Sequence, residues 1–87
     1  NDLVSKGSIS LADALKVGAY IEELDILDLE EGLKATTNTD VIQVYQKLLK
    51  GSINHLNAFA GNLERRTGLN YTPQLMSAEQ FKAYRSR

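Results

Sequence analysis

The chain has no cysteine and no tryptophan, and its 87 residues include one proline, one histidine and one methionine. Without cysteine there is no disulfide, no cysteine-ligated zinc and no thiol nucleophile. No apolar run approaches the roughly 20 residues that a membrane-spanning helix requires, so we expect no membrane association. No basic segment precedes an apolar stretch, as it would in a signal peptide. We therefore predict a soluble protein, cytoplasmic if the native N-terminus carries no signal.

The chain also has little net charge, −1 from 10 Lys and Arg and 11 Asp and Glu. A nucleic-acid-binding domain usually has a strong basic excess, so we predict no nucleic-acid partner. The charges are nevertheless unevenly distributed along the chain, because residues 1–40 carry a net charge of −6 and residues 41–87 carry +5. Six of the acids lie between residues 22 and 31. A functional interpretation has to account for that acidic cluster.

Turn and capping residues divide the chain into three predicted helices, at about residues 10–36, 39–67 and 78–85, within a single helical domain covering residues 1–87. The predicted caps are polar residues or glycine at the helix ends: Ser10, Asn38 or Thr39, Ser77 and Gly68. The first nine residues are interpreted as a leader or as the end of a truncated helix. No segment alternates in the way that predicts a β-strand, so the fold class is all-α.

Apolar residues in both long helices recur at alternating spacings of four and three residues, which places them along one face of each helix. The short polar turn between the helices favours an antiparallel hairpin. The first helix carries a second apolar stripe, formed by Ala14, Val17, Ile21 and Leu24. Two packed helices cover only one stripe each, so the second stripe needs a partner. We therefore predict half of a four-helix bundle, completed by a homodimer or by a missing half of a longer chain.

Polar residues interrupt the inward-facing stripes near the middle of both long helices. They are Glu22 and Asp25 in the first helix and Ser52 and His55 in the second. Glu22 lies about 16 residues before the turn centre and His55 about 17 after it, so an antiparallel hairpin brings them to a similar height. Converging carboxylates and imidazoles suit a divalent metal such as iron, manganese or zinc. We predict Glu22, Asp25 and His55 as ligands, and expect the small Gly18 and Ser52 to leave room for ions.

Other interpretations of these residues stay open. Glu22 and Asp25 are alternatively solvated or salt-bridged carboxylates, and a single core histidine such as His55 is usually held by hydrogen bonds. The neighbouring acids are expected to be surface charges that pair weakly with Lys47 and Lys50: Glu23, Asp28, Glu30 and Glu31. The alternative function is a non-catalytic helical interaction module without metal, whose polar core residues only set the register of the helices.

Four stretches of the sequence resemble the C-terminal half of an uncharacterised prokaryotic family of ferritin-like proteins: LADALKVGA at 11–19, IEELDI at 21–26, GSINHLNAF at 51–59 and YTPQ at 71–74. The resemblance implies a ferritin-like four-helix bundle with a dinuclear metal site, iron being the first expectation. It places Glu22 at the ligand position of the third bundle helix and His55 at that of the fourth. The family's N-terminal half would supply another Glu and a Glu-x-x-His motif. Ser52 stands where a ferritin-like fourth helix usually has Glu, so we expect it to support the ligands from outside the coordination sphere.

Overall fold

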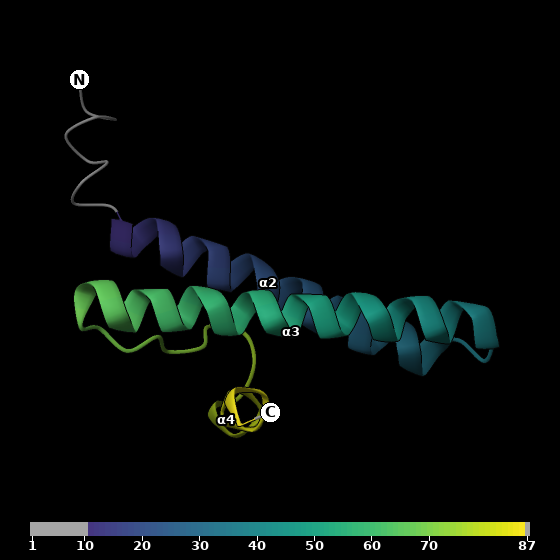
Figure 1. Ribbon diagram of the computed structural model, residues 1–87. Helices are drawn as coiled ribbons and strands as arrows, with labels where there is room; N and C mark the ends of the chain where they lie inside the picture. Colours follow the sequence, from purple (N-terminus) through teal and green to yellow (C-terminus); the bar gives the residue numbers. More distant parts are fainter. Residues whose placement is uncertain (1–10, 87) are drawn as a thin grey trace.

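The computed structural model describes residues 11–86 and folds them into three helices, with no strand among those residues. Helix α2 covers Leu11–Ala35, α3 covers Thr39–Thr67 and α4 covers Ala78–Arg85. Figure 1 shows α2 and α3 packed along their lengths, with the short α4 to one side. The all-α fold, the hairpin and the short C-terminal helix predicted from the sequence are therefore confirmed. The leader and the first N-cap predicted within residues 1–10 lie outside the described part of the chain.

Local capping interactions define the ends of the helices. The Asn38 side chain accepts hydrogen bonds from two backbone N–H groups of the first turn of α3, at 2.9 and 3.2 Å. Gly68 adopts a left-handed conformation with φ of 74° directly after α3, which a residue with a Cβ rarely adopts. The Ser77 hydroxyl accepts a hydrogen bond from the backbone N–H of Gln80, at 3.1 Å, and caps α4. These caps confirm the turn chemistry predicted from the sequence.

The hydrophobic core lies between α2, α3 and the chain that follows α3. Its most buried apolar residues among those described are Ala19, Ile26, Ile53, Leu56, Ala60, Leu63, Tyr71, Met76 and Tyr84. Gly18 allows the ring of Phe59 to approach α2 closely, because a Cβ at this position would lie 2.6 Å from that ring. The expectation that Gly18 leaves room for ions is therefore wrong, since Phe59 occupies the space.

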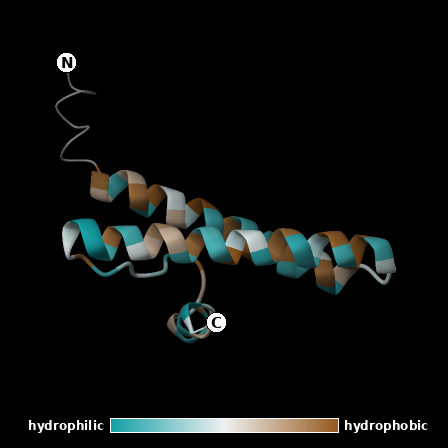
Figure 2. Ribbon diagram, viewed as in Figure 1, coloured by the Kyte–Doolittle hydropathy of each residue, from teal (hydrophilic) through white to brown (hydrophobic). Residues whose placement is uncertain are grey.

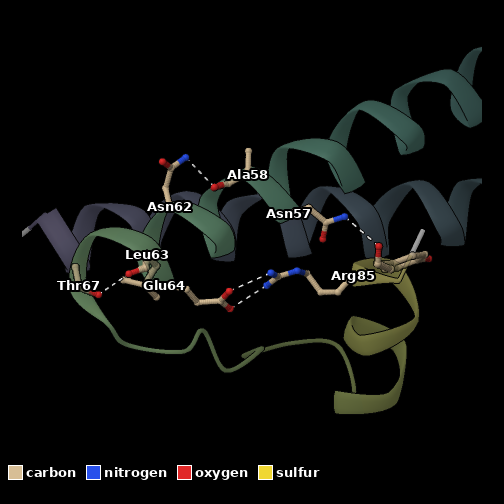
Figure 3. Close-up of polar contacts among 8 residues, drawn as sticks. Asn57, Ala58, Asn62, Leu63, Glu64, Thr67 and Arg85 are labelled. Carbon is tan, nitrogen blue, oxygen red and sulfur yellow. Dashed lines mark hydrogen bonds and ion pairs between the residues drawn. The ribbon is translucent and has the colours of Figure 1, made fainter.

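One side of the hairpin is covered by the strap, which we define as residues 68–77, and by α4. In Figure 1 the strap runs beneath α3. Helix α4 is seen end-on in the same view, so it crosses the direction of the hairpin. The guanidinium of Arg85 donates to both carboxylate oxygens of Glu64, at 3.0 and 3.1 Å (Figure 3). The Asn57 amide donates to the backbone carbonyl of Tyr84, at 3.0 Å. These contacts fix α4 to the middle and C-terminal parts of α3.

The other side of the hairpin, which we call the open face, has no cover among the described residues. At 100° per residue its side chains point away from the strap. Its large apolar residues are 44–57% exposed: Val17, Ile21, Leu24, Val44 and Leu48. Figure 2 shows hydrophobic residues recurring along both long helices. The predicted second stripe of α2 is therefore present and lacks a partner within residues 11–86. No helix in that range has the length and apolar character needed to cross a lipid bilayer.

Candidate functional site

Glu22 and His55 meet across the hairpin, at the edge of the open face. Oε2 of Glu22 in α2 lies 3.4 Å from Nδ1 of His55 in α3. The Glu22 side chain is 14% exposed, whereas that of His55 is 67% exposed. The antiparallel arrangement of the helices brings the two residues to the same height, as the sequence predicts. His55 is therefore accessible from the open face and is not enclosed in the core.

A groove of about 310 Å³ adjoins this pair. It is lined by residues of both long helices: Leu15, Glu22, His55, Ala58, Phe59 and Asn62. Among these described residues, the carboxylate and the imidazole are the only ionisable groups, and most of the others are apolar. The arrangement offers an oxygen and a nitrogen donor on an otherwise apolar surface, and this combination can bind a metal ion only if further ligands approach from outside.

The remaining predicted site residues do not join the pair. Asp25 is exposed and makes no hydrogen bond or ion pair in the described part of the chain. Ser52 is partly buried, and its hydroxyl likewise has no hydrogen-bond partner there. Across residues 11–86, no three His, Asp or Glu side chains converge in an arrangement that could hold a metal ion. The structure therefore brings together two of the three predicted ligands.

Glu23, the residue after Glu22, points about 100° away from it around α2, toward the strap, and is fully buried. Its carboxylate accepts a hydrogen bond from the Tyr71 hydroxyl. It also accepts hydrogen bonds of 2.8–3.0 Å from three consecutive backbone N–H groups of the strap, those of residues 74–76. We call these contacts the Glu23 clasp. The expectation that Glu23 is a surface charge is wrong, because the strap brings enough donors to satisfy a buried carboxylate.

The clasp shifts the ionisation of both of its side chains. Burial by itself would raise the pKa of Glu23, but the hydrogen bonds from Tyr71 and from the strap N–H groups outweigh it and leave the pKa below its ordinary value. Burial and the hydrogen bond to the negative Glu23 raise the pKa of the Tyr71 phenol. Glu23 is therefore an anion and Tyr71 a neutral donor at neutral pH.

Glu30 repeats the pattern of Glu23 two turns further along α2. Its carboxylate accepts hydrogen bonds from the Tyr84 hydroxyl and from the Gln80 side chain, the latter at 2.9 Å. The expectation that Glu30 is a surface charge is therefore wrong as well. Glu31, by contrast, is exposed and pairs with Lys34 at 3.7 Å. A spacing of seven residues places Glu23 and Glu30 on one face of α2, and this spacing was the available signal that they share a role.

Comparisons with known proteins find similarity along nearly the whole chain. Residues 1–85 match the family described as an uncharacterized protein domain, DUF2202. The uncharacterized protein MJ0754 of Methanocaldococcus jannaschii is 52% identical over 80 residues, which cover 92% of this chain and 43% of that protein. The crystal structure of hypothetical protein MJ0754 matches with a TM-score of 0.84 and 50% identity, covering 99% of this chain and 49% of that one. The chain therefore spans less than half the length of the relative.

Proposed function

From the premise that the chain belongs to the DUF2202 domain family, we propose that it is one hairpin of a ferritin-like helical bundle that binds a divalent metal. Iron is the first candidate, with manganese and zinc as alternatives. The observation that carries the proposal is the meeting of Glu22 and His55, 3.4 Å apart, on the side of the hairpin that the strap leaves open. The carboxylate and the imidazole are donors that all three metals accept. A metal bound there would serve as a redox centre or as a Lewis acid.

Two donors are too few for a stable site, so the remaining ligands have to come from a second helical hairpin. The exposed apolar side chains beside the pair support this requirement, since a soluble domain rarely leaves such a surface uncovered. The second hairpin would come from the other half of a longer polypeptide or from a second copy of this chain. The relative, of which this chain covers 43%, has sequence enough for a second hairpin, and this length favours the first source.

Metal analysis tests the proposal directly. If two copies complete the site, the chain, purified without chelator and incubated with Fe(II), Mn(II) or Zn(II), is expected to retain metal after gel filtration; if the rest of a longer polypeptide completes it, the same retention is expected of the full-length relative. Glu22→Gln and His55→Ala should each abolish retention, because each removes one of only two donors. Glu31→Gln is the matched control, since it removes an exposed carboxylate from the same helix.

Two results would contradict the proposal. One is equal metal retention in the unmodified chain and in both site variants. The other is the absence of metal from a sample that light scattering shows to be dimeric or larger, because the second hairpin would then be present. A metal-free monomer would contradict the assembly of two copies and leave only the longer polypeptide as the source, to be tested with the full-length relative.

The second candidate function is a helical interaction module without metal. It is favoured by the absence of a third ligand near Glu22 and His55 within residues 11–86. In this case the two polar residues only set the register of a partner helix, and Glu22→Leu or His55→Leu should raise stability without weakening assembly. Thermal melts of these variants with and without added metal separate the two functions, because only a metal site makes the unmodified chain melt higher when metal is present.

A further inference from the structure

Helix α2 has two apolar faces, and hydrophobic burial alone does not decide which one packs against α3. The face in use buries Ala19 and Ile26 completely. The other face carries Val17, Ile21 and Leu24, which are also large and remain 44–57% exposed. The face in use also packs Ala12, Leu15 and Leu27 against the core, and turning α2 about its axis would offset part of that apolar burial with the second set. Packing of the Phe59 ring against Gly18 opposes such a rotation, and a polar interaction adds a further selection of the observed orientation.

The Glu23 clasp supplies that selection. A carboxylate with no exposed surface is very unfavourable unless donors surround it, and in the observed orientation four donors do so. In a rotated α2, Glu23 would leave the strap, and three neighbouring backbone N–H groups would lose their acceptor. Rotation would therefore leave both the Glu23 carboxylate and the strap N–H groups without their hydrogen-bond partners.

We infer that Glu23 is a positioning residue, whose contact with the strap fixes the rotation of α2 so that Glu22 faces His55. Adjacent residues of a helix lie 100° apart, so holding Glu23 against the strap directs Glu22 toward α3, on the side where His55 lies. The metal-binding consequence of this inference rests on the proposed function, whereas the geometric consequence does not. The strap, which does not touch the candidate site, thereby controls whether its two donors meet.

Nuclear magnetic resonance provides a readout of the geometry that needs no metal. His55 is the single histidine of the chain, so its imidazole protons give unique resonances. In the unmodified chain we expect one set of these resonances, with nuclear Overhauser contacts to the methylene protons of Glu22. Glu23→Gln keeps the size of the side chain but removes the charge and turns an N–H donor toward the strap donors. We expect this variant to lose those contacts or to show a second set of His55 resonances.

A control and a milder variant separate positioning from general stability. Glu64→Gln breaks the Arg85 ion pair, which also anchors the C-terminal segment, but should leave the His55 contacts intact. Tyr71→Phe removes one donor of the clasp and leaves the carboxylate in place, so a smaller change in the His55 resonances is expected. This variant replaces Glu23→Gln in the experiment if Glu23→Gln does not fold. The inference would be overturned if folded Glu23→Gln showed one unchanged set of His55 resonances with intact contacts to Glu22. If Glu23→Gln does not fold, the same result in Tyr71→Phe would overturn it.

Metal retention forms the second arm of the experiment. If the unmodified chain retains metal, Glu23→Gln should lose it even though Glu22 and His55 are unchanged, and Glu64→Gln should keep it. If the unmodified chain retains no metal although it is dimeric or larger, the proposed function fails, and the resonances of His55 still decide whether Glu23 positions Glu22. Retention of metal by Glu23→Gln with unchanged His55 contacts would count against the inference alone.

Discussion

On the two sides of the hairpin, the described residues differ in how completely they supply hydrogen-bond partners to carboxylates and cover apolar side chains. On the strap side, the buried carboxylate of Glu23 has four hydrogen-bond donors, and apolar side chains are buried. On the open face, five large apolar side chains are about half exposed, and the carboxylate of Glu22 has one neighbouring histidine. The difference indicates where the proposed second hairpin would pack, because polar and apolar groups are incompletely partnered on the same side. It also supports the proposal that the candidate site and the assembly surface coincide.

The comparison predicts that equal truncations on the two sides have very different effects. Leu56 is fully buried, whereas Leu48, two turns earlier in α3, is 53% exposed on the open face. Leu56→Ala should lower the free energy of unfolding by about 2–5 kcal/mol, because it leaves a cavity in the core. Leu48→Ala should lower it by less than about 1 kcal/mol. Urea unfolding followed by circular dichroism measures both, and similar losses would show that the open face is already covered in solution.

The adjacent glutamates of α2 provide a second matched pair. Glu23→Gln should destabilise the chain by about 1–3 kcal/mol, because a buried cluster of donors loses its charged acceptor. Glu22→Gln should change the stability by less than about 1 kcal/mol, since its one partner is a largely exposed histidine. The same urea titrations give both values. A larger loss in Glu22→Gln than in Glu23→Gln would contradict the difference between the strap side and the open face.

The pH dependence of stability should reflect the Glu23 clasp on the strap side. The pKa of Glu23 is lowered in the folded chain, so its contribution is complete above its ordinary pKa of 4.5 and is lost as the pH falls through the lower folded value. The raised pKa of Tyr71 acts at the other extreme, and its contribution declines as the pH rises above 10.0. Unfolding midpoints from about pH 2 to about pH 11, compared with those of Glu23→Gln, should show a weaker acid dependence in the variant. If the midpoints of both proteins fell equally toward low pH, carboxylates other than Glu23 would determine the acid dependence of stability.

Much of the fold followed from local signals in the sequence, because caps and apolar periodicity depend on residues close together in the chain. Asn38, Gly68 and Ser77 each act within one helical turn of their position. The antiparallel turn likewise determines that Glu22 and His55 lie at the same height. The burial of Glu23 could not be predicted in this way, because its donors lie about 50 residues away in a strap without regular periodicity. Glu23 and Glu22 look alike in sequence, and only tertiary contacts distinguish them.

Two glycines offer the smallest and most discriminating comparison. Gly18 lies against the Phe59 ring, and Gly18→Ala should destabilise the chain by about 1–2 kcal/mol, because the ring has to move from a packed position. Gly51, in the middle of α3, has no described atom within 4 Å of the position that an added Cβ would take. Gly51→Ala should therefore stabilise the chain by about 0.5–1 kcal/mol through helix propensity. Thermal melts of the two variants measure both effects.

The sign of the Gly51→Ala effect also reports on the proposed second hairpin. In the chain alone the added methyl group meets only solvent, so the gain should appear in full. In an assembly that covers this part of α3, the same methyl group enters the interface and should reduce or reverse the gain, because packed interfaces tolerate little extra volume. Melts at low and high protein concentration separate the two situations for two copies of this chain. A gain that stays constant over a range in which light scattering shows dimerisation would place Gly51 outside the interface.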